Sequence, residues 1–259
     1  MSEAIRLEIS KSYNYYHSVK IIANKSSQSP EPTMIPISGI RAPGYIIPAT
    51  ATYEELNVIE KIYKKEHLLL KGNAKFALGV VTGNNRRHLR REPTENTEPI
   101  YRGKDIKPFQ FNSPEFYIQF KPAIYQQVAP VEMYRRRKIA YRFISDRIIC
   151  ALDSENRLLL NSANLFIPTL DYPLETIVAL FNSELYTFLY RKIFYSKKVL
   201  RSHLESLPLP VLSAEEHLLF KSLHEKYQAD NSDLGELNRA VYKIFNLSRE
   251  EIKVVEQGK

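Results

Sequence analysis

The chain has 259 residues, of which 44% are hydrophobic and 25% charged, and carries a formal charge of +8 at pH 7. This composition is typical of a globular protein, and the length suffices for one large domain or two small ones. The positive charge favours a polyanionic partner such as nucleic acid. The single Cys150 excludes an intramolecular disulfide and a cysteine-based zinc site. No signal peptide or apolar run of about 20 residues is visible, so we expect a cytoplasmic protein without a membrane partner.

The first 23 residues show the alternation of a β-hairpin. Ile5, Leu7 and Ile9 alternate with polar residues, and the alternation resumes at Val19 after a tyrosine-rich turn. Residues 24–52 lack any periodicity and contain five prolines, which predicts an extended linker.

Residues 53–67 are predicted to form a helix. Thr52 and Glu55 have the spacing of a capping box, and apolar side chains follow at helical intervals. The helix leads to a strand that begins near Ala74 and runs into Thr82-Gly83-Asn84-Asn85. Glycine and asparagine tolerate positive φ, so this segment predicts a tight turn at the tip of the strand.

The rest of the chain changes from strands to helices. Short strands are predicted at 115–121, 137–144, 147–152 and 158–167, with a hairpin turn at Ser145-Asp146. Residues 174–189 are apolar on most sides, which indicates a buried helix. Three further helices are predicted, capped at Ser213, starting near Leu234 and capped at Ser248. The fold class is therefore α+β, a mixed short-stranded, β-rich domain with a buried helix, followed by a C-terminal helical segment.

Catalytic signatures are missing from the sequence. An adenine methyltransferase needs a glycine-rich turn for its methyl donor and an acid or amide before Pro-Pro-aromatic to hold the flipped base. No Gly-x-Gly occurs, and Asn112-Ser113-Pro114-Glu115-Phe116 lacks the second proline. Asp105-Ile106-Lys107 and Asp153-Ser154-Glu155-Asn156 hold carboxylates, but we interpret them as chance spacing and a turn rather than a nuclease site. We expect no catalytic domain, no metal site and no cofactor bound by this chain.

Five segments resemble, in order, the TaqI-like C-terminal specificity domain, the target-recognition part of adenine-methylating restriction-modification enzymes. The resemblance covers roughly residues 52–212 and rests on Gly79-Val80-Val81-Thr82-Gly83-Asn84-Asn85, Arg102-Gly103-Lys104-Asp105-Ile106, Lys138-Ile139-Ala140-Tyr141-Arg142, Leu180-Phe181-Asn182-Ser183-Glu184-Leu185 and Leu207-Pro208-Leu209-Pro210. It implies two partners, double-stranded DNA and a methyltransferase or methyltransferase-nuclease domain or subunit. The complete enzyme would use S-adenosylmethionine, and magnesium if it contains a nuclease.

The resemblance also divides the chain. In the family the catalytic domain ends in strands just upstream, so the hairpin at 1–23 is either a remnant of that domain or an independent hairpin. Residues 24–52 are then the linker, 53–212 the recognition domain with its leading helix, and 213–259 the C-terminal helical segment.

Three groups of residues are candidates for contact with DNA, because arginine forks suit phosphates and the acceptor edge of guanine. For each group a solvated charged surface is the alternative. Asn84 or Asn85 is a candidate to pair with adenine, and Arg86 or Arg87 with guanine. The groups are Asn84, Asn85, Arg86, Arg87 and Arg90, with Lys104 nearby in the family frame; Arg135, Arg136, Arg137 and Lys138; and Lys197, Lys198 and Arg201.

The function expected from these features is sequence-specific recognition of duplex DNA for an adenine-specific restriction-modification enzyme. Phosphate contacts would supply affinity, and a few side chains on loops would read base edges. The alternative is a helical protein-interaction module with non-specific DNA affinity. An enzyme in its own right is a more remote third reading.

Overall fold

The computed structural model describes residues 51–230 and 233–258, Pro48, and the backbone of three N-terminal strands. These strands are β1 (Ile5–Ser10), β2 (Ser18–Ala23) and β3 (Thr33–Pro36), which pair antiparallel in the order β1-β2-β3. The predicted hairpin is present, with Ile5 opposite Ala23, while its predicted turn lies outside the described residues. The third strand corrects part of the predicted linker, because four residues are too few to show a period in the sequence.

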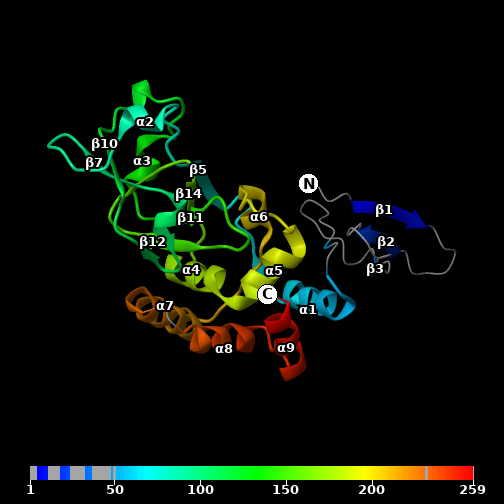
Figure 1. The fold of residues 1–259 in the computed structure, drawn as a ribbon. Coiled ribbons are helices and arrows are strands. Elements are labelled where there is room, and N and C mark those ends of the chain that lie inside the picture. Colours follow the sequence, from blue (N-terminus) through cyan, green and yellow to red (C-terminus); the bar gives the residue numbers. More distant parts are fainter. Residues whose placement is uncertain are drawn as a thin grey trace.

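A four-stranded antiparallel sheet forms the centre of the part of the chain that follows residue 50 (Figure 1). Its order is β12-β11-β14-β5, and its strands are β5 (Ala74–Leu78), β11 (Lys138–Arg142), β12 (Cys150–Asp153) and β14 (Ala163–Pro168). The predicted hairpin is confirmed as the β11–β12 pair. The strand expected at 158–167 is instead divided into β13 (Leu158–Leu159) and β14 by a turn. This sheet has β5 at one edge.

The central sheet separates two hydrophobic cores, because successive side chains of a strand point to opposite faces. On β11, Ile139 and Tyr141 join the core shared with the helices, while Ala140 joins the other core. On β14, Phe166 and Leu165 divide in the same way. The strands are therefore buried on both sides, which explains why they have apolar runs rather than an apolar–polar alternation.

The second core lies beneath a smaller sheet of order β13-β7-β10-β6, in which only the β13–β7 pair is parallel. Figure 1 shows short helices α2 and α3 beside this sheet, at one end of the molecule. The elements of this region are α2 (Asn85–His88), β6 (Leu89–Arg90), β7 (Glu98–Tyr101), the 3-10 turn η2 (Gly103–Asp105), the hairpin β8 (Ile106–Lys107) and β9 (Gln110–Phe111), β10 (Phe116–Ile118), the 3-10 turn η3 (Pro122–Ile124) and α3 (Val131–Tyr134).

On the other face of the central sheet α4 packs against β12 and β11, and further helices pack on α4 and α5 to continue the same core (Figure 1). The expected capping boxes are present at Thr52, Ser213 and Ser248. The helices are α1 (Tyr53–Lys64), α4 (Leu174–Asn182), α5 (Glu184–Phe194), α6 (Arg201–Ser206), α7 (Ala214–Ala229), α8 (Gly235–Ile244) and α9 (Arg249–Gln257).

Two helix boundaries differ from the sequence prediction. α1 ends at Lys64 because the following residues form β4 (His67–Leu68), which pairs with β15 (Leu209–Pro210). The predicted buried helix is two helices, because the Ser183 hydroxyl accepts a hydrogen bond from the Tyr186 N–H and caps α5. Within the described part of the chain, no helix combines the length and apolar character needed to cross a bilayer.

Candidate nucleic-acid interface

Residues 82–90, which follow β5 and include α2 and β6, form a compact turn that we call the tip. Gly83 has a φ of 77°, which confirms the positive φ expected in this turn. The chain then enters the single turn of α2, where Asn84 Oδ1 accepts a hydrogen bond from the Arg87 N–H at 3.1 Å. Asn85 Oδ1 accepts one from the Thr82 hydroxyl at 2.6 Å. Both asparagine oxygens are therefore engaged within the tip itself.

Three arginines of the tip lie exposed on α2 and β6. Arg86, Arg87 and Arg90 have no ion-pair partner among residues 51–230 and 233–258. The Arg90 guanidinium donates a hydrogen bond to the Arg87 backbone carbonyl at 3.1 Å, which places the Arg90 charge next to Arg87. This cluster supplies guanidinium groups whose charge is not balanced locally, as a phosphate-binding surface requires.

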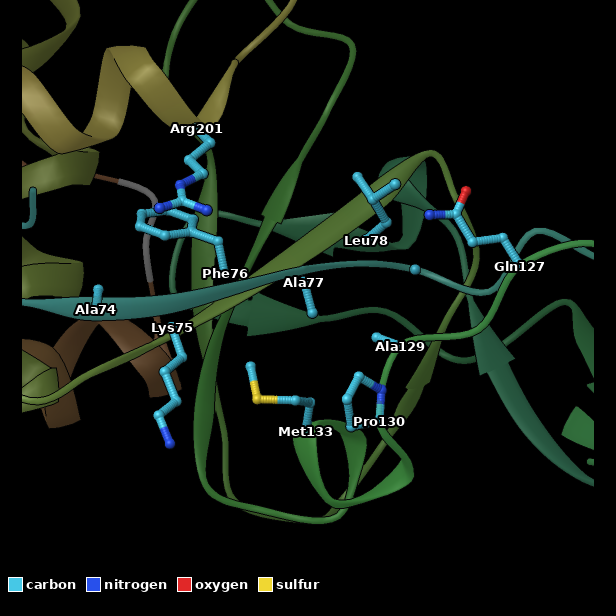
Figure 2. A pocket seen from close by; sticks show the side chains of 11 residues that line it. Ala74, Lys75, Phe76, Ala77, Leu78, Gln127, Ala129, Pro130, Met133 and Arg201 are labelled. Atoms are coloured by element: carbon cyan, nitrogen blue, oxygen red, sulfur yellow. The ribbon is translucent and has the colours of Figure 1, made fainter. Parts of the chain in front are cut away.

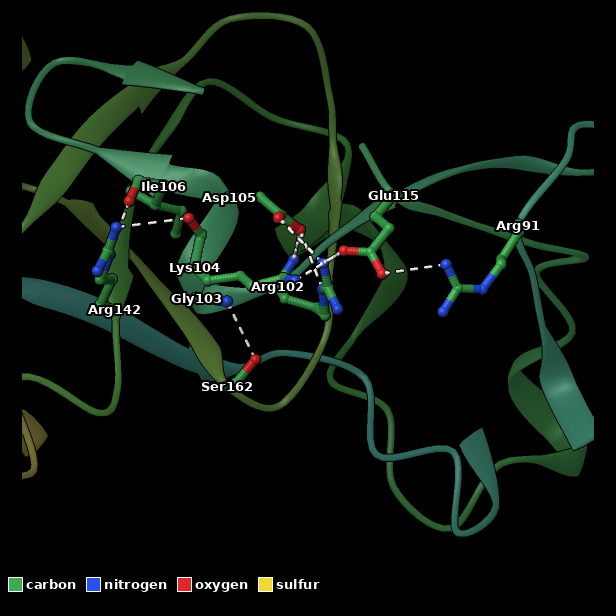
Figure 3. Close-up of polar contacts among 9 residues, drawn as sticks. All are labelled: Arg91, Arg102, Gly103, Lys104, Asp105, Ile106, Glu115, Arg142 and Ser162. Carbon is green, nitrogen blue, oxygen red and sulfur yellow. Dashed lines mark hydrogen bonds and ion pairs between the residues drawn. The ribbon is translucent and has the colours of Figure 1, made fainter. Parts of the chain in front are cut away.

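Lys104 belongs to a different, balanced network around Glu115 (Figure 3). Lys104 Nζ lies 2.7 Å from a Glu115 carboxylate oxygen, Arg102 also pairs with Glu115, and Arg91 approaches it to 3.8 Å. Hydrogen bonds from Lys104 and then Arg102 lower the pKa of Glu115 to about 2. Asp105 accepts a 2.8 Å hydrogen bond from the Arg102 N–H. Lys104 is exposed, but a carboxylate offsets much of its charge.

Two glycines of the family-like segments have a packing role. A Cβ on Gly79 would lie 2.2 Å from the Leu160 carbonyl oxygen, and one on Gly103 would lie 2.2 Å from the Ser162 carbonyl oxygen. The Gly103 N–H also donates to the Ser162 hydroxyl at 3.0 Å (Figure 3). Both glycines therefore allow segments distant in sequence to approach the turn between β13 and β14.

The second basic group does not form one surface. Arg135 makes a two-pronged contact with Glu98, at 2.6 and 2.7 Å, and Arg137 pairs with Glu175 of α4. Arg136 is exposed, without an ion pair among the described residues.

Lys138 corrects the sequence prediction. Its side chain is fully buried and pairs with Asp153, because β11 is a central strand with a core on each face. Burial lowers the pKa of Lys138, and its ammonium also donates to the Tyr134 carbonyl at 2.6 Å. A DNA phosphate has no access to it in this structure.

The third basic group lies on the loop before α6 and at its first turn. Lys197, Lys198 and Arg201 are exposed. The loop is held by backbone hydrogen bonds from Ser145 N–H to the Lys197 carbonyl at 3.1 Å and from Val199 N–H to the Phe143 carbonyl at 2.8 Å. The Arg201 guanidinium lies 5.2 Å from the centre of the Phe76 ring on β5 and pairs with Glu205 at 2.8 Å.

A groove along the β5 edge is lined by Arg201 of the third group and by Gln127, which lies beside the strand that leads to the tip. Figure 2 shows Arg201 above Phe76 in a row of β5 side chains, Gln127 beyond Leu78, and Met133 below. The groove has a volume of about 520 Å³ and includes Phe76 and Leu78 in its lining. Gln127 in turn pairs with Val81, immediately before the tip. Arg201 therefore lies against the strand that leads to the tip, whereas Arg137 pairs with Glu175 of α4.

Comparison with known proteins identifies part of the chain. Residues 98–209 match the sequence profile of the TaqI-like C-terminal specificity domain. The Type II methyltransferase M.VspI of Vibrio sp. (strain 343) is 38% identical over 64 residues, which are 25% of this chain and 16% of that protein. The profile match starts after the tip, so Gly79 to Asn85 lie outside it.

Solved structures share the fold at low sequence identity. The Type IIL restriction-modification enzyme MmeI, solved in complex with DNA, gives a TM-score of 0.52 at 10% identity, covering 95% of this chain and 41% of that one. The type IIG restriction endonuclease BpuSI gives 0.50 at 8% identity, covering 80% and 32%. This chain therefore spans less than half the length of each of these relatives.

Proposed function

We propose that this chain, whose residues 98–209 form a TaqI-like C-terminal specificity domain, recognises a short sequence in double-stranded DNA. In this proposal it serves a restriction-modification enzyme and positions an adenine-specific methyltransferase, or a methyltransferase-nuclease, over its target. The chain itself performs no catalysis. The methyl donor S-adenosylmethionine, and magnesium where a nuclease is present, would be bound by the catalytic partner.

The observation that carries this proposal is the tip, whose exposed Arg86, Arg87 and Arg90 form no ion pair with any residue of 51–230 or 233–258. Arg86 and Arg87 lie on a one-turn helix whose cap is the neighbouring Asn84, so their positions are fixed by the β5–α2 junction. The helix backbone is already ordered and the arginine fork is planar, so binding a phosphate or a guanine edge orders only the side-chain stems. A loop presented by a sheet can approach a groove of DNA without a helix-turn-helix.

The β5 edge supports the same proposal by extending the basic surface away from the tip. Further cationic groups are Arg201, which lines the groove and pairs with Glu205, and Lys197 and Lys198, which precede it in sequence. Phosphate contacts at two separated places would fix the register of the protein on the duplex, while residues between them face the bases. We therefore propose that the β5 edge of the protein, which carries this groove, faces the DNA duplex.

A competition experiment tests this function. The complete 259-residue chain is titrated against fluorescent duplexes from a randomised library, at several salt concentrations and with excess unlabelled random DNA. Selection of one sequence over competitor by a factor of at least ~10³ is expected for a recognition domain. A steep salt dependence without any selection would instead identify a non-specific basic scaffold and would overturn the proposal.

A further inference from the structure

Sequence-specific recognition requires side chains that are free to pair with bases. In the major groove adenine presents an acceptor at N7 and a donor at N6, and a glutamine or asparagine amide matches both. The two asparagines of the tip are poorly placed for this role, since Asn84 Oδ1 caps Arg87 at 3.1 Å and Asn85 Oδ1 accepts the Thr82 hydroxyl at 2.6 Å. To pair with adenine, either asparagine would have to share this oxygen with the contact that builds the tip or rotate away from it.

A second loop, residues 122–129, lies directly beside the tip. Val81 and Gln127 exchange two backbone hydrogen bonds, of 2.9 and 3.0 Å. A Cβ placed on Gly83 would lie 3.4 Å from the Gln126 Cβ and 3.6 Å from its Oε1. Gln126 and Gln127 therefore sit against the turn that carries the exposed arginines, although some 40 residues separate them in sequence.

The loop is anchored at both ends. The Tyr125 hydroxyl donates to the Gln119 carbonyl at 2.5 Å, and the Tyr125 ring contacts the His88 ring of α2 edge-on, with the ring centres 5.2 Å apart. The Tyr134 hydroxyl accepts from the Ala129 N–H at 3.1 Å and donates to the Leu78 carbonyl at 2.8 Å. Anchoring reduces the entropy lost when the loop's side chains bind, which is how a preorganised reading surface gains affinity.

Both glutamine side chains are exposed, and neither amide has a hydrogen-bond partner among the described residues. Gln127 also lines the β5 groove, where Figure 2 shows its amide beside Leu78. Within the described part of the chain these two amides are therefore free to act as donor–acceptor pairs beside the cationic side chains of the tip.

We propose that Gln126 and Gln127, and not Asn84 or Asn85, make the amide contacts to adenine in the recognised sequence. The inference rests on the proposed function and names residues that determine its specificity. Arg86, Arg87 and Arg90 would meanwhile hold the phosphates around the base pair that the glutamines read. Because the loop and the tip share the Val81–Gln127 pairing, the phosphate contacts and the base contacts would stay in fixed register.

The test compares sequence selection by variants of the complete chain. Wild type, Gln126→Ala, Gln127→Ala and the double variant are each selected against a randomised duplex library. Gln228→Ala, which removes an exposed amide on α7, is the matched control. Gln127→Glu is a second variant, because a carboxylate only accepts hydrogen bonds and suits the N4 donor of cytosine rather than adenine. A thermal melt followed by circular dichroism serves as the control that each variant is folded.

The expected result is a loss of discrimination confined to A·T pairs at one or two positions. The loss should be roughly tenfold or more for each glutamine, with wild-type preference at the other positions. Gln127→Glu should change the preferred base from adenine towards cytosine, and Gln228→Ala should select the wild-type site. A glutamine variant that keeps the full wild-type preference, or loses affinity equally for every sequence, would overturn this inference and leave the proposed function standing. A wild-type chain that selects no sequence would instead refute the proposed function from which it starts.

Discussion

Lys138 and Asp153 face each other across the β11–β12 hairpin and form an ion pair that is completely buried. Asp153 also accepts hydrogen bonds from the N–H groups of Glu155 and Arg157, both at 2.9 Å. The carboxylate thus organises the turn that follows β12, and the lysine fills a position that the strand turns inward. Lys138 is the last residue of an Arg-Arg-Arg-Lys run, but its role in this structure is to stabilise the fold.

Replacing Lys138 by Met should destabilise the fold without a specific effect on DNA binding. The substitution leaves the Asp153 charge buried with only Arg157 to pair with it, and breaking a buried pair in this way costs about 3–5 kcal/mol. Urea unfolding measures the change. The variant Lys138→Met with Asp153→Leu should recover part of the loss, since no buried carboxylate remains. A stable Lys138→Met protein with weakened DNA binding would show that the lysine is accessible after all.

Gly103→Ala should reduce the free energy of unfolding by about 1–3 kcal/mol, because the new methyl group must displace the Ser162 carbonyl from the turn. Gly72→Ala is the control for backbone strain alone. Gly72 has a φ of 76° and an open surrounding, so alanine there should cost about 1 kcal/mol. Thermal or urea unfolding distinguishes the two. An equally mild effect at both positions would mean that the close approach at Gly103 is not required.

Arg87→Ala should weaken binding to all duplexes and lower the slope of log K against log salt by about 0.9, the value for one lost phosphate contact on B-DNA. Arg137→Ala removes the same charge from a side chain that pairs with Glu175 near α4, so its slope should equal that of wild type. Anisotropy titrations at four or more salt concentrations provide the slopes. Equal slopes for Arg87→Ala and wild type would remove the tip from the phosphate-binding surface.

Glu115→Gln should strengthen DNA binding to every sequence, roughly threefold for one unit charge a few ångströms from a phosphate. The carboxylate now offsets Lys104 and Arg91, and its removal raises the local positive charge while Asp105 still holds Arg102. Competition between cognate and random duplexes should give an unchanged ratio, because no base contact is altered. Weaker binding would indicate that Glu115 positions these side chains for DNA rather than screening them.

His203 should make the stability depend on pH in the acidic range. Its ring stacks on Phe194 with the ring centres 4.3 Å apart, and burial lowers its pKa from 6.5 to about 4. Between these values the unfolded chain binds more protons, so the free energy of unfolding should rise with pH from about 4 to 6.5. The difference between wild type and His203→Asn, measured by urea unfolding, isolates this contribution. A difference that is constant across the interval would contradict the burial of a neutral ring.

Local sequence determined the elements whose signals lie within a few residues. The capping boxes at Thr52, Ser213 and Ser248 and the β11–β12 hairpin are where the pattern places them, because caps and tight hairpins depend on neighbours in the chain. The break between α4 and α5 at Ser183 could not be predicted from the sequence. A serine within an apolar run can cap a new helix or lie inside a continuous one, and the local pattern is the same in both cases.

Long-range pairing decided the site. The sequence contained the arginine-rich segment and most of the family-like segments that fall within the profile match at residues 98–209. It had no means to show that Lys138 points inward, that Glu115 balances Lys104, or that Gln127 pairs with Val81. Charge and residue type are properties of single positions, whereas exposure and the identity of a partner depend on which face of the sheet a strand presents and which distant loop covers it. Only the tertiary structure fixes those.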